Sequence, residues 1–152
     1  SKYDGGARIP FLAFWKGTIQ PQVSDALLFQ GDLAASFAAM LNVKVMDGEL
    51  PDSENHLAAL LGDTTDGRKE VLYESVSKAR VLRQGKWEYL EPSKGGLREV
   101  NTGIELGNSK RGQLYNMQYD PGQREDVIDQ YPNVAKAMDQ RIREILDSSR
   151  TR

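Results

Sequence analysis

The sequence predicts a mixed fold, α/β to α+β: a fragment of a parallel α/β sheet, with one strand and one helix, followed by a small antiparallel sheet packed by a C-terminal helix. Residues 10–15 are apolar at every position, which is typical of a strand that helices bury on both faces. Residues 79–91 instead alternate about a glycine turn, as an antiparallel hairpin does. We therefore predict two domains: 1–62, a piece of a buried parallel α/β sheet, and 69–152, an antiparallel-sheet-plus-helix subdomain.

The first domain contains one strand and two helices. After the strand, Asp32 can cap a helix. Residues 56–62 predict a short helix that glycine ends. A strand followed by a crossover helix requires a parallel partner strand, and an unpaired edge favours association. We therefore expect the neighbouring strands to lie outside this chain. The longer helix is indicated by apolar residues at helical spacing: Leu33, Phe37, Met40 and Leu41.

The second domain contains short strands and a closing helix. One strand is predicted before the hairpin, at residues 70–75. The hairpin is followed by a long glycine-rich loop, 92–112, and then by another predicted strand at residues 113–119. The final helix begins at Pro132, a residue that suits a first helical position. Its apolar stripe, which predicts packing across the sheet, consists of Val134, Met138, Ile142 and Ile145.

Composition excludes several functions. The formal charge of -2 gives no reason to expect a nucleic-acid partner. No apolar run reaches the ~20 residues of a membrane span. The chain has no cysteine, which excludes thiolate chemistry within it. Its one histidine, His56, lies in the first turn of a short predicted helix, where a solvated or capping role is expected.

A collinear series of short motifs resembles the C-terminal portion of a sulfatase of the arylsulfatase type, in the alkaline-phosphatase-like superfamily. No single motif is very specific, but their order and spacing together are. The motifs are Tyr3-Asp4-Gly5-Gly6, Arg8 with Pro10, Trp15-Lys16-Gly17, Gly31-Asp32-Leu33, Arg83 to Trp87, Leu114-Tyr115-Asn116-Met117 and Asp120-Pro121-Gly122-Gln123.

The resemblance implies hydrolysis of sulfate monoesters, of an aryl or saccharide sulfate, by a formylglycine nucleophile beside calcium. It also implies that residues 1–62 are the C-terminal end of the α/β catalytic domain of the sulfatase. Both the nucleophile and the calcium ligands of the family come from segments upstream of this chain. The family's sulfate-contacting lysine falls just before Ser1. We therefore expect no catalytic residue and no metal ligand in this chain, and no activity from this segment alone.

Two sets of residues are candidates for contact with substrate. The first is a possible pocket edge at Lys2, Tyr3 and Asp4, for which the alternative is a tight turn that feeds the strand. The second is a possible substrate-specificity loop, for which the alternative is a solvated loop. Its basic residues, which suit a sulfated ligand, are Lys94, Arg98, Lys110 and Arg111.

Other residues are less specific. We expect Arg8 to pair with a carboxylate, and Trp87 and Tyr89 to be core residues rather than a sugar-stacking surface. Glu88 stands where the family usually has Lys, and Gln123 where it usually has Glu. Both departures are interpreted as loop or surface changes.

Two alternatives to the sulfatase remain: a stand-alone binding or scaffold module without catalysis, and a phosphatase or phosphonate hydrolase on the same fold. As a sulfatase, the protein would act on a sulfated small molecule or saccharide and would require the missing N-terminal part. Family habit predicts a periplasmic or secreted location.

Overall fold

The computed structural model describes residues 1–76 and 78–148. The chain divides into two compact units, which we describe separately. One consists of Ser1–Ile9 and Leu72–Asp147, and the other contains Pro10–Val71. The domain boundaries 1–62 and 69–152 stay a prediction, because they refer to a larger parent protein.

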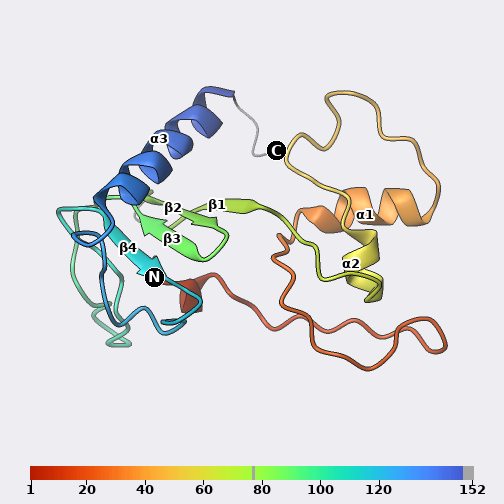
Figure 1. Cartoon of the computed structure of the whole chain (residues 1–152), viewed down its shortest axis with the longest axis horizontal. Helices are drawn as coiled ribbons and strands as arrows, with labels where there is room; N and C mark the ends of the chain where they lie inside the picture. Colours follow the sequence, from red (N-terminus) through yellow and green to blue (C-terminus); the bar gives the residue numbers. More distant parts are fainter. Residues whose placement is uncertain (77, 149–152) are drawn as a thin grey trace. The chain divides into compact units, whose positions relative to one another are not determined.

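The predicted antiparallel sheet and closing helix are confirmed (Figure 1). The sheet has the order β1-β2-β3-β4. Arg83 of the second strand is registered with Glu88 of the third, and Glu88 with Tyr115 of the fourth, and both pairings are antiparallel. The elements are β1 (Glu70–Glu74), β2 (Arg80–Gln84), β3 (Trp87–Leu90), β4 (Gln113–Asn116) and α3 (Pro132–Ser148).

The two faces of this sheet carry different side chains, because successive residues of a strand point in opposite directions. One face packs against α3 and forms the larger apolar core, whose members include Leu82, Tyr89, Leu114, Met138 and Ile142. The other face carries a smaller apolar cluster that the N-terminal segment helps to cover. Its members are Val81, Leu90, Tyr115 and Met117, with Tyr3 and Tyr73 packed against them.

The second unit contains α1 (Asp32–Met40) and α2 (Leu57–Leu61), both close to their predicted positions. Gly62 ends α2 with a φ of 85°, in the left-handed region that glycine adopts without strain. Gly31 is the N-cap of α1, and Asp32 is its first helical residue rather than its cap.

The strand predicted at 10–15 is not formed, since this segment belongs to no ladder in the described part of the chain. A strand needs a partner for its backbone N–H and C=O groups, and the described residues offer none here. Its side chains are correspondingly uncovered: Leu12 is 91% exposed and Phe14 is 90% exposed. Within this unit, most of the apolar surface of residues 10–15 therefore remains exposed to solvent.

Candidate functional site

The N-terminal segment Lys2–Asp4 is held firmly against the sheet unit. Lys2 is buried, and its Nζ donates hydrogen bonds to the Glu91 carbonyl oxygen at 2.7 Å and to Ser93 Oγ at 2.8 Å. Its backbone N–H donates to the Leu106 carbonyl at 3.0 Å. Burial lowers the pKa of Lys2 to about 8, although the negative charge of Glu91 acts to raise it. Lys2 is thus an anchor between the N-terminal turn and the loop 92–112.

The base of that loop is closed by its own polar contacts. The Ser93 backbone N–H donates to the Ser109 carbonyl at 2.7 Å, and Ser93 Oγ donates to Asn108 Oδ1 at 2.8 Å. Asn108 in turn donates to the Gly96 carbonyl at 2.8 Å. Since Lys2 bonds to this base, the structure brings the predicted pocket edge and the predicted specificity loop next to each other.

Asp4 is the first residue of a short 3₁₀ helix, η1 (Asp4–Gly6), and Tyr3 immediately precedes it. The Tyr3 ring meets Tyr115 edge-on, with 6.0 Å between ring centroids. The Asp4 backbone N–H donates to Gln123 Oε1 at 2.6 Å, and the Asp4 carboxylate accepts Arg8 Nε at 2.7 Å. Arg8 therefore pairs with a carboxylate, as expected. Contact of Lys2, Tyr3 or Asp4 with substrate stays a prediction.

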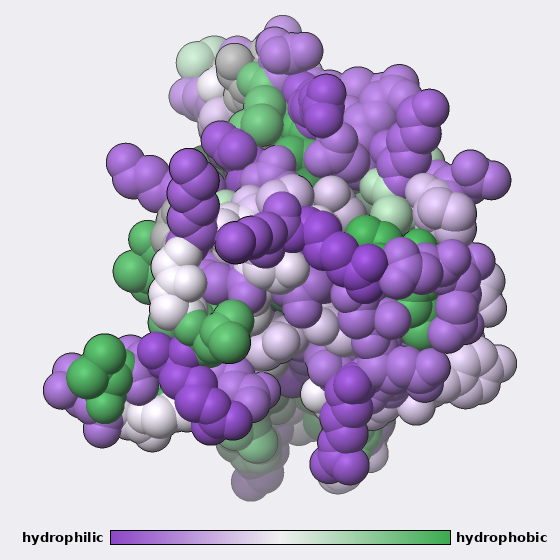
Figure 2. Space-filling view, turned by 90° about the vertical axis from the view of Figure 1, so that its left-hand side faces the viewer, coloured by the Kyte–Doolittle hydropathy of each residue, from purple (hydrophilic) through white to green (hydrophobic). Residues whose placement is uncertain are grey.

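The four basic residues of the loop divide into two pairs. Arg98 is paired with Glu105 at 2.5 Å, and Arg111 is paired with Asp129 at 3.0 Å. Lys94 and Lys110 are exposed, and neither has an ion pair within the described residues. The face that Figure 2 shows is mainly hydrophilic, with only small separate hydrophobic groups. Of the four basic residues of the loop, Lys94 and Lys110 are therefore the two whose charge no described residue compensates, so they are the candidates for an anionic ligand.

Glu88 and Gln123 are not surface residues, so the interpretation of these two departures was wrong. Glu88 is 0% exposed and Gln123 is buried. Gln123 Nε2 donates to Glu88 Oε1 at 3.0 Å, so the two departures from the family pattern touch each other. Burial, helped by the charge of Asp4, raises the pKa of Glu88 to about 7. The N-terminal turn and the turn at 120–123 cover this face of the sheet, which the sequence pattern left open.

Trp87 and Tyr89 both belong to the core side of the sheet. Tyr89 is buried beneath α3, and burial raises its pKa to about 12. Trp87 is half-buried and packs on Tyr131, with 4.9 Å between ring centroids, while Lys86 Nζ lies 5.2 Å from the Trp87 ring centroid. The arrangement matches the expected core role and leaves no open aromatic platform at Trp87.

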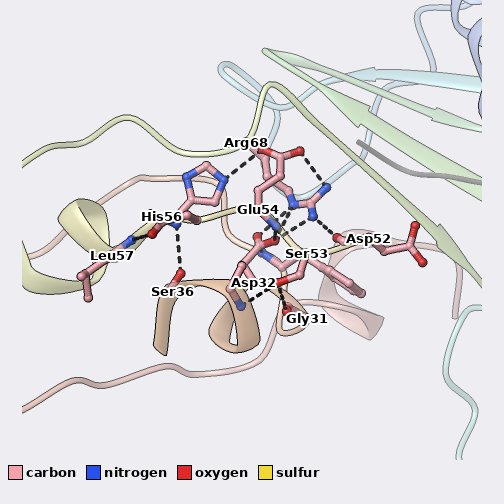
Figure 3. Close-up of polar contacts among 12 residues, drawn as sticks. Gly31, Asp32, Ser36, Asp52, Ser53, Glu54, His56, Leu57 and Arg68 are labelled. Carbon is pink, nitrogen blue, oxygen red and sulfur yellow. Dashed lines mark hydrogen bonds and ion pairs between the residues drawn. The ribbon is translucent and has the colours of Figure 1, made fainter. Parts of the chain in front are cut away.

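The second unit has a buried ionic cluster at the start of α1 (Figure 3). The Asp32 carboxylate accepts Arg68 Nε at 2.8 Å and Arg68 Nη2 at 2.7 Å, and both side chains are 2% exposed. Arg68 also pairs with Glu54 at 3.2 Å and donates to the Asp52 carbonyl. The cluster fixes the loop before α2 onto α1.

His56 belongs to the border of this cluster rather than to a catalytic arrangement. Its Nε2 lies 3.2 Å from Glu54 Oε2, and its backbone N–H donates to Ser36 Oγ at 2.9 Å (Figure 3). The contacts hold the chain at the start of α2, so the role of His56 is structural. Among residues 1–76 and 78–148, no group of three or more His, Cys, Asp or Glu side chains is placed to hold a metal ion. No helix in the described part of the chain is long and apolar enough to cross a membrane.

Comparison with known proteins identifies the family. No family model matches the chain. The chain is 35% identical over 152 residues to an N-acetylgalactosamine-6-O-sulfatase of Bacteroides thetaiotaomicron, and this match covers all of the chain and 29% of the relative. It is 24% identical over 155 aligned residues to arylsulfatase A of Bos taurus, covering 94% of the chain and 30% of the relative.

Solved structures are similar as well, and one of them is described here. It comes from work on the metabolism of multiple glycosaminoglycans by Bacteroides thetaiotaomicron. It matches with a TM-score of 0.80 and 33% identity, covering 91% of this chain and 28% of that one. The chain thus spans less than a third of the length of these relatives. It belongs to the sulfatase family and corresponds to the C-terminal region of these enzymes.

Proposed function

We propose that this chain is the C-terminal part of an enzyme that hydrolyses sulfate monoesters of saccharides. The observation that supports this proposal is the 35% identity over all 152 residues to an N-acetylgalactosamine-6-O-sulfatase. A sulfated saccharide is therefore the substrate class that we propose for the whole protein.

In this proposal the chain lines the substrate pocket and supplies no reacting group. The N-terminal turn, which Lys2 anchors, would form one edge of the pocket. Next to it, Lys94 and Lys110 would attract the anionic substrate, because they are exposed cations with no ion pair in the described residues. We assign the formylglycine nucleophile and the calcium ligands to the remainder of the longer protein, as the resemblance to the family implies.

The apolar segment 10–15 supports the proposal that the chain works as part of a larger protein. Phe11, Leu12, Phe14 and Trp15 are all exposed in the isolated unit. With Leu33, Phe37 and other apolar residues of α1 and α2 they line a shallow hollow of about 320 Å³. We propose that the remainder of the sulfatase covers this surface and pairs with the segment as a strand. A stand-alone module would leave it in water, which is unfavourable by ~25 cal/mol per Å² of apolar surface.

The experiment compares sulfate and phosphate ester hydrolysis by the full-length protein that contains this chain. The substrates are 4-nitrophenyl sulfate, 4-nitrophenyl phosphate and N-acetylgalactosamine 6-sulfate, and the isolated 152-residue chain is the control. We expect sulfate release by the full-length protein and none by the isolated chain. Faster hydrolysis of the phosphate ester would favour the phosphatase alternative, and binding without hydrolysis would favour the module.

We also propose a periplasmic or secreted location for the full-length protein. Cell fractionation tests this proposal: recovery in the cytoplasmic fraction would contradict it.

A further inference from the structure

A buried glutamate lies at the centre of the sheet face that the N-terminal segment covers. Glu88 Oε1 accepts a hydrogen bond from Gln123 Nε2 at 3.0 Å and one from the Tyr73 hydroxyl at 3.2 Å. Its other oxygen, Oε2, is buried without a hydrogen-bond partner, 3.9 Å from Arg83 Nη1. A fully buried carboxyl group with an unsatisfied oxygen is costly, and this feature requires an explanation.

The two partners of Glu88 both reach the backbone of the N-terminal turn. The Tyr73 hydroxyl lies 3.2 Å from the carbonyl oxygen of Lys2. Gln123 Oε1 accepts the backbone N–H of Asp4 at 2.6 Å. The peptide groups on both sides of Tyr3 are therefore held by side chains that themselves bond to one carboxyl group.

The hydrogens of this network cannot satisfy every contact at once. A tyrosine hydroxyl has a single proton, so Tyr73 donates either to Glu88 or to the Lys2 carbonyl. When Glu88 is ionised, its carboxylate is the stronger acceptor and takes that proton. When Glu88 is protonated, its own O–H can donate to the Tyr73 oxygen, and the Tyr73 proton is then free to bond to Lys2. Protonation of Glu88 therefore strengthens the hold on the N-terminal turn.

The surrounding charges favour a change of protonation near neutral pH. Burial and the negative charge of Asp4 raise the pKa of Glu88 to about 7, while Arg83 and the two hydrogen bonds act in the opposite direction. Burial, with the charge of Glu88, also raises the pKa of Tyr73, which stays a neutral donor. The groups that face Glu88 from the packed elements are Asp4, Tyr73, Arg83 and Tyr115, with Arg8 behind Asp4.

We propose that Glu88 is a positioning residue of the sulfatase: through Tyr73 and Gln123 it sets the position of the turn at Tyr3, and its protonation state decides how tightly that turn is held. The inference rests on the proposed function, because it is in the sulfatase that this turn borders the substrate pocket. Since burial raises the pKa of Glu88 to about 7, Glu88 is mainly protonated on the acidic side of neutral pH and mainly ionised on the alkaline side.

The test compares the full-length wild-type protein with Glu88→Gln and Tyr73→Phe. Glutamine keeps the acceptor oxygen but does not titrate, and phenylalanine keeps the ring but removes the bridge to Lys2. Hydrogen exchange of the peptide that contains residues 2–6 is measured at pH 6 and pH 8, corrected for the intrinsic dependence on pH. We expect the wild type to lose protection severalfold at pH 8, and both variants to show no such step.

Enzyme kinetics give the second readout. The ratio of wild-type to Glu88→Gln kcat/KM for a sulfate ester, measured from pH 5.5 to 8.5, should fall severalfold as pH rises through 7. A ratio independent of pH, together with equal exchange in the wild type and both variants, overturns the inference. If the wild type hydrolyses no sulfate ester, the proposed function fails, and the exchange data alone then decide the role of Glu88.

Discussion

Removal of the Asp32 carboxylate is the perturbation with the clearest expected cost. Both oxygens of this buried group are occupied: the Arg68 guanidinium donates to them at 2.7–3.0 Å, and the backbone N–H groups of Phe29 and Glu54 each donate at 2.9 Å. Burial alone would raise the pKa of Asp32, but the hydrogen bonds and charge of Arg68 hold it below its usual value. Asp32→Asn removes the charge and turns an NH₂ group towards these donors.

The magnitude follows from the burial of Arg68. Loss of one partner from a buried pair costs about 3–5 kcal/mol, and Glu54, which lies 3.2 Å from Arg68 and is 34% exposed, offsets only part of the lost charge. The matched control is Asp25→Asn in the same unit, where the carboxylate is exposed. That substitution should change stability by less than about 0.5 kcal/mol.

The assay is pulse proteolysis in urea of the full-length protein, with cleavage sites mapped to residues 10–71. At pH 7 we expect Asp32→Asn to shift the midpoint far below that of Asp25→Asn. The stabilising effect of a carboxylate with a lowered pKa is present above its usual value of 3.8 and is lost as pH falls through the lowered one. The difference between wild type and variant should therefore shrink in acid. Equal midpoints for the two variants at pH 7 would refute the reasoning.

Three further predictions concern stability. The side chain of Ile142, on the buried face of α3, is 0% exposed. Ile142→Ala should therefore lower the free energy of unfolding by about 2–5 kcal/mol, measured by chemical denaturation. Arg143→Ala, on the exposed side of the same helix, serves as its control, and equal effects would contradict the packing. Glu88 has a pKa raised from 4.5 to about 7, so its ionisation costs up to ~3 kcal/mol of stability as pH rises through this range. Glu88→Gln should accordingly raise the melting temperature at pH 8 relative to wild type more than at pH 5, and a pH-independent difference would exclude this cost. Gly62→Ala, at a φ of 85°, should destabilise by about 1 kcal/mol or more, through strain in the left-handed region and because the added methyl group must displace the Gln22 side-chain amide. An unchanged unfolding midpoint would disprove this expectation.

The sheet unit was predictable because its signals are local. Alternation about the turn at Gly85 predicts β2 and β3, and the stripe that contains Met138 and Ile142 predicts a helix packed on one side. Each of these patterns reports on neighbours that the chain itself provides. The prediction of a strand at 10–15 was wrong for the opposite reason. The composition of this segment indicates burial on two faces, but the described residues do not supply the partners that a strand needs.

The polar clusters were harder to foresee. Glu88 alternates with core residues of β3, so an outward, solvated side chain was the natural interpretation. Only the folded chain shows that the turns at Asp4 and Gln123 cover this face. The one local signal was Arg83, which lies opposite Glu88 across the hairpin. Arg68 lies in a polar linker, and nothing in its neighbours along the sequence indicates that it is buried against Asp32.

The sequence proposes the parts of the candidate site but not their arrangement, and contact of these residues with substrate stays a prediction. The sequence singled out Lys2 and the loop 92–112 separately, for different reasons. Their direct contact through Ser93 depends on the long-range packing of the N-terminal segment against the sheet. This contact is the structural basis for treating the two sets as one candidate pocket wall.

The most direct test of the central claim is an intact-mass measurement with peptide mapping of the full-length protein. The account predicts a polypeptide well above the 17.0 kDa of this chain, with a Cys/Ser-x-Pro-x-Arg peptide whose first residue is converted to formylglycine. A protein of 17.0 kDa, or a longer one without that peptide, would contradict the assignment of this chain to a sulfate ester hydrolase.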